Sequence, residues 1–359
     1  MKIKKNKMFG KAKPFTGELI ERTQACTSCG KNEAIQIGKV DYWDIKQSNV
    51  VQCTACKLTQ LDPMLTSEET AKGCLAYYIE ESGRTSKREE QKNHVRNYRR
   101  GYLFAQSLNS RGIQPKHILE TGPGSGYFCQ GIKAVFTSVE VTVMDVNPKV
   151  LEFNKHEHGY HTILSELETT LADFENKFDL IIARDILEHV IDISAVLKNF
   201  RTYLNSGGYL HFITPNGHED VWKHHLAFIL KNEPSELLIN HVNYFDGHGL
   251  RSLLNRNSFN EIEYYTYKLK HYRRGKGWKV ANKLMAAIST KKSSDEFINK
   301  TLPETESAPK VDILNKWYLK TNLKFITRLV VWYQHTNLIK LNPDKNVGHE
   351  IYGLFRLMK

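Results

Sequence analysis

Residues 118–128 read ILETGPGSGYF, and this stretch decides the fold. An apolar run ends in an acid at Glu120, glycines follow at positions 122, 124 and 126, and an apolar run then resumes. A strand that passes through a glycine-rich turn into a helix from about Tyr127 places backbone N–H groups and a helix N-terminus beside a ligand. Glycines allow a contact that a Cβ atom would block. A turn without a ligand is the alternative, but three glycines carry an entropic cost that ordinary turns avoid.

A second acid indicates the kind of ligand. The apolar stretch VEVTVMD ends in Asp145, 25 residues after Glu120, where a carboxylate can accept hydrogen bonds from both hydroxyls of a ribose. The glycine spacing is G-x-G-x-G, and no later glycine completes the G-x-G-x-x-G pattern of dinucleotide sites. The sequence therefore predicts a nucleoside ligand and does not require a pyrophosphate.

The stretches around these motifs predict an α/β fold. From His117 the short apolar runs HILE, VEVTVMD, FDLIIAR and YLHFITP alternate with amphipathic stretches, which indicates a mostly parallel, Rossmann-like sheet with helices on both faces. We expect a helix over 86–109, a turn at Gly207 and Gly208, and two later strands over 261–269 and 349–357. Between those two strands lies a long insertion.

The chain divides into five predicted segments. Residues 1–20 form a basic, flexible arm, and residues 21–62 form a small cysteine module with the β-prone stretches AIQIGKV and NVVQC. A linker and a lead-in helix occupy 63–115. The α/β core covers 116–267 and is completed by 348–359, and a basic helical insertion or lid covers 268–347.

Composition and charge narrow the classes of function. The 359 residues are 40% apolar, which suffices for a real core, and no run of 18 apolar residues or signal-length segment follows the lysine-rich start. We therefore expect a cytoplasmic protein. The net charge of +12 falls entirely within 268–359, where 19 Lys and Arg face 7 Asp and Glu. A nucleic-acid enzyme would place its basic surface around the active site, so no nucleic-acid partner is expected.

Four of the six cysteines predict a metal site. CTSC places Cys26 and Cys29, and CTAC places Cys53 and Cys56 after 23 intervening residues. Two such pairs supply four thiolates for a closed tetrahedral zinc shell, which leaves no position for substrate and is structural. A thiol-redox pair is the alternative, and two separate pairs flanked by short strands argue against it. The zinc is therefore predicted to stabilise residues 21–62.

Taken together, several motifs resemble those of the class I S-adenosylmethionine-dependent methyltransferases. ETGPGSG, MDVNP, FDLIIARDILEHV and LNSGGYLHFITPN occur in the order and spacing of that family, over residues 88–267 plus the last strand. Within the family the chain is most similar to bacterial enzymes with an N-terminal zinc ribbon, including sugar C-methyltransferases. The cysteine pairs, the two tyrosines at 77 and 78 and HVNYF at 241–245 carry this resemblance. Lys57 replaces a frequent glycine, and the additional C-terminal domain of the sugar enzymes is missing.

The resemblance implies a seven-stranded sheet and assigns the cofactor site. Gly122, Gly124 and Gly126 would pass under the methionine part of S-adenosylmethionine, and Asp145 would hold its ribose. Glu120 would anchor the amino group of the cofactor, directly or through water. Asp185, at the end of the fourth strand, would face the cofactor amine or the substrate, or else cap a helix through Glu188.

The resemblance also indicates candidates for catalysis. His241 in HVNYF is the expected base, ahead of His218, His224 and His225, although a packed histidine is the alternative. Tyr78 would fold over the acceptor, or pack in the core. Some ubiquinone-pathway O-methyltransferases bind a divalent metal at a cluster similar to DILEH, here Asp185, Glu188 and His189, which lie at i, i+3 and i+4 on one face of an expected helix. Relatives without a metal carry the same letters.

We therefore expect methyl transfer from S-adenosylmethionine to a small-molecule acceptor, a sugar or related metabolite. O-methylation is favoured over C-methylation because Asn240 replaces a glutamate of the sugar C-methyltransferases. Alternatives are a nucleic-acid methyltransferase, which DILEH argues against, and a partner-binding module without activity. A further alternative is a membrane-surface enzyme acting on a lipid-linked acceptor. Residues 311–341 predict a basic amphipathic helix for contact with the anionic inner membrane surface, with a lid helix as the preferred reading.

Overall fold

The computed structural model describes residues 15–42, 45–70, 72, 87–231, 233–236, 241–269, 338–345 and 348–358. The chain divides into two compact units, Met1–Thr266 with Leu341–Lys359, and Tyr267–Lys340. Tyr78, Asn240, most of the predicted arm and nearly all of the predicted basic insertion lie outside the described residues. No helix in the described ranges is both long and apolar enough to cross a membrane.

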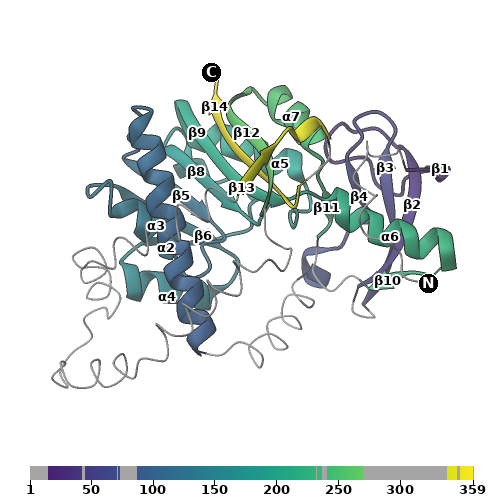
Figure 1. Cartoon of the computed structure of the whole chain (residues 1–359), viewed down its shortest axis with the longest axis horizontal. Coiled ribbons are helices and arrows are strands. Elements are labelled where there is room, and N and C mark those ends of the chain that lie inside the picture. Colours follow the sequence, from purple (N-terminus) through teal and green to yellow (C-terminus); the bar gives the residue numbers. More distant parts are fainter. Residues whose placement is uncertain are drawn as a thin grey trace, which may run out of the picture. The chain divides into compact units, whose positions relative to one another are not determined.

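A twisted sheet forms the centre of the first unit (Figure 1). Within this unit its strands follow the order β12-β14-β9-β8-β5-β6-β7. Strands β7, β6, β5, β8 and β9 run parallel to their neighbours, whereas β14 pairs antiparallel with β9. The strands are β5 (His117–Thr121), β6 (Glu140–Asp145), β7 (His161–Leu164), β8 (Phe178–Arg184), β9 (Leu204–Pro215), β12 (Phe259–Leu269) and β14 (Glu350–Leu357). The predicted mostly parallel α/β fold is confirmed.

Helices cover both faces of this sheet because alternate strand residues point to opposite sides. Ile118 of β5 and Ile182 of β8 belong to a cluster with Phe104, Leu108 and residues of α3. Their neighbours along the two strands, Leu119 and Ile181, belong to a second cluster on the opposite face. Figure 1 shows α2 and α3 side by side. The helices are α2 (Lys87–Ser110), α3 (Tyr127–Lys133), α4 (Pro148–His158), α5 (Ile193–Tyr203) and α7 (Gly247–Arg256), with the 3₁₀ turns η1 (Ala172–Phe174) and η2 (Pro343–Lys345).

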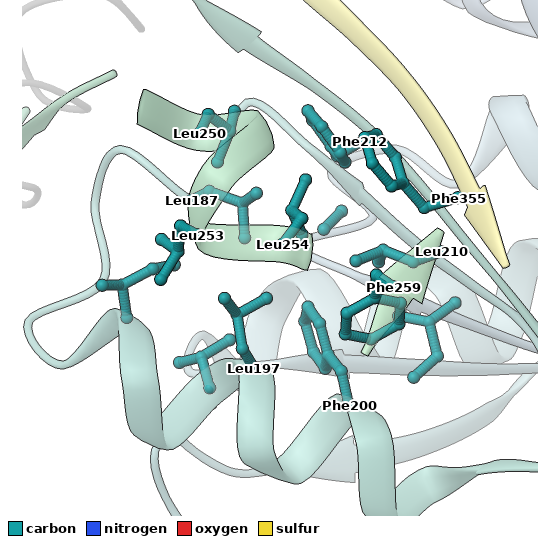
Figure 2. Packing of buried hydrophobic residues seen from close by; sticks show 14 of the residues in the cluster. Leu187, Leu197, Phe200, Leu210, Phe212, Leu250, Leu253, Leu254, Phe259 and Phe355 are labelled. Atoms are coloured by element: carbon teal, nitrogen blue, oxygen red, sulfur yellow. The ribbon is translucent and has the colours of Figure 1, made fainter. Parts of the chain in front are cut away.

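The second cluster is the larger part of the core. In Figure 2, Leu197 and Phe200 of α5 point toward Leu253 and Leu254 of α7 and toward Phe259 of β12. All five side chains are at most 2% exposed. Burying side chains of this size contributes about 1.5–3 kcal/mol each. This packing fixes α5 and α7, and with them the loops at the carboxyl ends of the strands.

The cysteine module builds a second sheet with residues from later in the chain. It contains β1 (Glu18–Glu21), β2 (Glu33–Tyr42), β3 (Lys46–Cys53) and β4 (Thr59–Asp62). Beyond the module, β11 (Asn243–Tyr244) pairs with β4, and β10 (Ser235–Glu236) pairs with β2. The helix α6 (His218–Lys231) also packs on β2. Residues 21–62 therefore share a sheet with residues that precede and follow His241.

Three local predictions differ from the structure. Asp185 to Val190 form a turn, with the His189 amide donating to the Ile186 carbonyl at 2.9 Å, and not a helix. Strand β9 begins at Leu204, so Gly207 lies in an irregularity of the β8–β9 pairing and not in a turn before the strand. The last residues of the predicted amphipathic helix form β13 (Leu338–Leu341). In each case hydrogen bonds between segments distant in the sequence, or a tight turn, override the local periodicity.

Candidate functional site

The candidate site lies where the connections of the sheet change direction. From β5 the chain goes on to β6 and β7 on one side, and β8 and β9 occupy the other side. The loops after β5 and β8 are therefore neighbours that diverge to opposite sides, and such a switch point leaves a crevice at the carboxyl ends of the strands. The glycine loop follows β5, and Asp185 follows β8.

All three glycines of the loop adopt left-handed backbone conformations. Their φ angles are 59°, 53° and 69° at Gly122, Gly124 and Gly126. A Cβ atom at Gly122 would meet the Ile186 side chain, and one at Gly126 would meet Asn154. At Gly124, in contrast, no described atom lies within 4 Å of the Cβ position. Protein packing explains the first and third glycines, whereas the space over Gly124 is open among the described residues.

Helix α4 orients the loop through side chains that bind its carbonyl groups. The Asn154 amide donates to the Gly124 carbonyl at 2.8 Å, and His158 Nε2 lies 2.8 Å from the Ser125 carbonyl. Within the described residues, the amide N–H groups of Gly124 and Ser125 have no acceptor. The loop thus offers two free donors beside open space, which suits a carboxylate.

Asp145 ends β6, the neighbour of β5, as the sequence predicts. The Asn147 amide donates to Asp145 Oδ1 at 2.8 Å, which orients the carboxylate. Partial burial raises the pKa of Asp145, and the hydrogen bonds from the amides of Asn147 and Val146 oppose this rise. The adjacent Val146 side chain is 64% exposed. An oriented carboxylate beside an exposed apolar side chain can receive the sugar and the flat base of a nucleoside.

Glu120 lies deeper than the sequence suggests. Its side chain is 2% exposed, and its Oε2 has no hydrogen-bond partner within the described residues. Burial raises the pKa of Glu120 to about 7, although the positive charge of Arg184 opposes this rise. Arg184 stacks on the Phe128 ring, with its guanidinium carbon 4.1 Å from the ring centroid. The anchoring of a cofactor amino group by Glu120 stays a prediction.

Asp185 adopts a strained backbone at the end of β8. Its φ angle is 55°, and its amide donates to the Ile213 carbonyl at 2.7 Å. A left-handed conformation costs a non-glycine residue about 1–2 kcal/mol, and such strain gathers at functional sites. Asp185 does not cap a helix, because Asp192 caps α5 by accepting hydrogen bonds from Ser194 and Ala195. The alternative prediction of a helix cap is therefore wrong.

Glu188, His189 and His241 form a cluster that sequence spacing alone does not reveal. One oxygen or ring nitrogen from each residue lies within 4.8 Å of the other two. The two imidazole ring centroids are 4.9 Å apart. Burial, followed by the nearby charge of Asp185, raises the pKa of Glu188 to about 8, and the Thr214 hydroxyl donates to its Oε2 at 2.9 Å. His241 thus joins the last two residues of DILEH.

The chemical types of these three donors suit a divalent cation, but the distances between the donor atoms do not. A carboxylate oxygen and two imidazole nitrogens are acceptable ligands. Adjacent ligands on an ion with bond lengths of about 2.1 Å would be about 3 Å apart. The observed separation of Glu188 Oε1 and His189 Nε2 is 3.9 Å. The arrangement is therefore better described as an acid–imidazole cluster than as a formed metal site.

Main-chain hydrogen bonds bring His241 to this cluster. The amides of Val242 and Asn243 both donate to the Glu188 carbonyl, at 2.8 and 3.1 Å. The Asn243 side-chain amide donates to the carbonyls of Leu187 and Val190 at 3.3 and 2.6 Å. His241 is fixed next to DILEH by these contacts, although 51 positions separate it from His189.

The four predicted cysteine ligands come together. Cys26 Sγ lies 3.5 Å from Cys56 Sγ, and Cys29 Sγ lies 3.6 Å from Cys53 Sγ. Zinc–sulfur bonds of about 2.3 Å in a tetrahedron place sulfurs about 3.8 Å apart, so the residues fit a zinc ion. The positions after the pairs, Gly30 and Lys57, have φ angles of 71° and 63°. Lys57 therefore keeps the turn that glycine would make.

Comparison with known proteins identifies the α/β part. Residues 93–264 match the family described as "Methyltransferase domain". The matched residues include the glycine loop, Asp145 and the DILEH turn. It is 26% identical over 117 residues to a ubiquinone biosynthesis O-methyltransferase of Proteus mirabilis, covering 31% of this chain and 46% of that protein. The enzyme of the same name from Histophilus somni is 29% identical over 32% of this chain and 50% of its own length.

Only part of each of these relatives is matched. The chain spans about half the length of the curated relatives it matches. A solved O-methyltransferase from a trans-AT polyketide synthase of Brevibacillus brevis, in complex with S-adenosyl-L-homocysteine, is 12% identical with a TM-score of 0.38. That comparison covers 73% of this chain and 72% of the other.

The other candidate bases pack α6 against the sheet of the cysteine module. His224 Nδ1 lies 2.6 Å from Ser235 Oγ, and His225 Nδ1 lies 2.8 Å from the Ile37 carbonyl. His218 Nε2 accepts a hydrogen bond from the Trp222 indole at 2.9 Å. These three histidines hold α6 and its neighbours in place, whereas His241 lies beside the DILEH turn.

Proposed function

We propose that this protein transfers a methyl group from S-adenosylmethionine to a small-molecule acceptor. The observation that carries the proposal is the open space over Gly124, bordered by two free amide donors at the switch point of a methyltransferase-domain sheet. Asp145 supplies a carboxylate at the end of β6, the strand next to β5, which is where sheets of this kind hold the ribose of a nucleoside.

The cofactor would be held by the residues around this space. The amides of Gly124 and Ser125 would bind the carboxylate of its methionine part, and Asp145 would accept its ribose hydroxyls. Val146 would lie against the adenine, because its exposed apolar side chain is adjacent to Asp145. When bound, the sulfonium supplies an already activated methyl group, so the protein must mainly align the acceptor with it.

His241 is the proposed base for that acceptor. It is partly exposed and lies beside His189 and the buried Glu188, in the turn that follows β8. Because Glu188 has a pKa near 8, it is largely protonated at neutral pH and does not compete as a proton acceptor. His241 would remove the proton from the acceptor, and Asp185 would bind its polar groups. Tyr78 remains a proposed contact to the acceptor.

The acceptor is proposed to be a hydroxylated metabolite, with a sugar as one option and oxygen as the methylated atom. The similarity to two enzymes named ubiquinone biosynthesis O-methyltransferases supports O-methylation. A nucleic-acid acceptor has no support among the described residues. Action on a lipid-linked acceptor at a membrane surface depends on residues that lie almost entirely outside the described ranges.

A structural zinc ion is the second proposed group. Four thiolates complete its tetrahedral shell, so no coordination position is left for substrate or water. Its proposed role is structural: it would hold together the two cysteine-containing turns of the module. No step of methyl transfer takes place on it.

Cofactor binding by paired glycine variants tests the proposal. Gly124→Val places a side chain in the open space and should lower S-adenosylmethionine affinity at least about 100-fold in calorimetry, because a buried clash removes most of the contact. Gly112→Val is the matched control, since Gly112 also has a left-handed backbone (φ 72°) with no described atom near its Cβ position. Equal cofactor affinity in both variants and the wild type would refute the proposed site.

A further inference from the structure

We propose that the cysteine module positions the catalytic histidine, and that Asn243 and Gln60 are the positioning residues that connect the two. This inference rests on the proposed role of His241. It assigns to residues 21–62 a task in the reaction beyond their own folding. A continuous set of hydrogen bonds runs from the turn at Cys26 to the turn at Glu188.

Asn243 is the centre of this network. It is 1% exposed and lies two residues after His241. Its backbone amide donates to the Glu188 carbonyl, and its side-chain amide donates to the carbonyls of Leu187 and Val190. These three bonds hold the segment of His241 against the DILEH turn. The remaining polar atom of the side chain, Oδ1, points to a different partner.

That partner is Gln60 of the cysteine module. Gln60 is fully buried, and its Nε2 donates to Asn243 Oδ1 at 2.7 Å and to Thr27 Oγ1 at 2.5 Å. Its Oε1 accepts from Arg22 at 3.2 Å. Both amide hydrogens and the carbonyl of Gln60 are therefore used. A buried network of this kind is rigid when complete, and losing one member leaves the others unpaired.

Thr27 belongs to the first metal-binding turn, between Cys26 and Cys29. Its backbone carbonyl accepts a hydrogen bond from the Ser194 hydroxyl at the start of α5. The next residue, Ser28, accepts from Arg256 at the end of α7, at 3.0 Å. The turn that would hold the metal is thus seated on the two helices that cover one face of the methyltransferase sheet.

A main-chain connection runs parallel to these side chains. The Leu61 amide of β4 donates to the Val242 carbonyl at 3.1 Å, and the Val242 amide donates to the Glu188 carbonyl at 2.8 Å. Strand β4 therefore pairs with the residues that immediately follow His241, and those residues pair with DILEH. Because His241 precedes a strand of only two residues, it has no long element of its own to hold it.

These hydrogen bonds connect the cysteine module to the segment that carries the candidate base His241. Removal of the Gln60 amide should let the Asn243 side chain and the preceding His241 shift. A displacement of about 1 Å at a catalytic group can cost about 100-fold in rate. Zinc binding and cofactor binding should be unaffected, because Gln60 contributes no ligand atom to either site.

Gln60→Leu tests this directly, with Gln52→Leu as control. Gln52 lies on β3 of the same sheet, and its side-chain amide donates to Thr59 Oγ1 at 3.4 Å, within the cysteine module. In Gln60→Leu we expect one zinc per chain, unchanged S-adenosylmethionine affinity and a kcat lower by about 10- to 100-fold with little change in KM. The His241 imidazole resonance, assigned by its loss in His241→Ala, should shift in Gln60→Leu and stay in place in Gln52→Leu.

The outcomes separate this inference from the proposed function. An unshifted His241 resonance in a folded, zinc-bound Gln60→Leu protein would overturn the positioning role, whatever the activity. A shifted resonance in a protein that does not bind the cofactor would support the connection and refute the function instead. If Gln60→Leu does not fold, Ser194→Ala, which removes only the hydrogen bond to Thr27, takes its place and should shift the same resonance by a smaller amount.

Discussion

His241 is a residue whose position depends on its neighbours. It lies just before β11, and the hydrogen bonds from the Val242 and Asn243 amides to the Glu188 carbonyl hold the backbone that follows it. The ring meets His189 at a centroid distance of 4.9 Å and an interplanar angle of 64°.

If His241 is the base, His241→Ala should lower kcat by about 10²- to 10⁴-fold and leave cofactor affinity intact, because proton removal is needed only in the reaction step. His248→Ala serves as control, since the His248 side chain is 76% exposed on α7. Turnover is measured together with the melting temperature on the same preparation. A variant with near wild-type turnover and a lowered melting temperature would show that His241 only packs.

At the level of helices and strands, local patterns and distant contacts contribute differently. The strand ending at Asp145, the helix from Tyr127 and the two strands of the cysteine module follow from apolar periodicity and glycine positions, and the structure contains them. The short edge strand β7 has no such signal. The spacing of the acids and the histidine in DILEH predicts a helix. The structure has a turn there, because the Glu188 carbonyl accepts hydrogen bonds from the amides of residues 242 and 243, which the local sequence does not reveal.

The candidate site shows the same division. Gly124 and Asp145 could be predicted because a motif places them next to strands of one sheet. The cluster of Glu188, His189 and His241 could not be predicted, because contacts between residues far apart in the sequence bring it together. Asn243, two residues after His241, is held by Gln60 of β4 across 183 positions. Gln60 and Asn243 carry no sequence signal at all: an isolated amide side chain is usually exposed, and only burial shows its role.

The two predicted metal-binding turns lead to a prediction about the zinc content of the protein. Cys53→Ser should reduce bound zinc well below one ion per chain, because a hydroxyl is a much weaker zinc ligand than a thiolate. Cys129→Ser is the matched control, as Cys129 is fully buried in α3 and lies outside the four-cysteine group. Elemental analysis of the purified proteins measures the difference. Equal zinc content in both variants would count against the site.

On the scale of the whole molecule, the centre of the sheet carries ionisable groups that the fold keeps away from water. Glu120 and Arg184 lie on neighbouring strands, β5 and the end of β8; Glu120 is buried and Arg184 is partly buried. His211 on β9 is 1% exposed, and burial lowers its pKa to about 3. Folding therefore shifts the protonation of the core, and stability must depend on pH.

The raised pKa of Glu120 predicts that the free energy of unfolding falls as the pH rises. Its pKa rises from 4.5 in the unfolded chain to about 7 in the folded protein, so the folded state holds the proton more tightly. The stabilising contribution is complete below pH 4.5 and is lost as pH rises through 7, by about 3 kcal/mol in total. In Glu120→Gln the neutral side chain persists at every pH. Between pH 5 and 8 the free energy of unfolding, measured by denaturant titration without cofactor, should therefore fall less in Glu120→Gln than in the wild type. Glu152→Gln, a change at an exposed residue of α4, should follow the wild-type curve. Identical pH profiles for all three proteins would mean that Glu120 is not the group that folding forces to keep its proton.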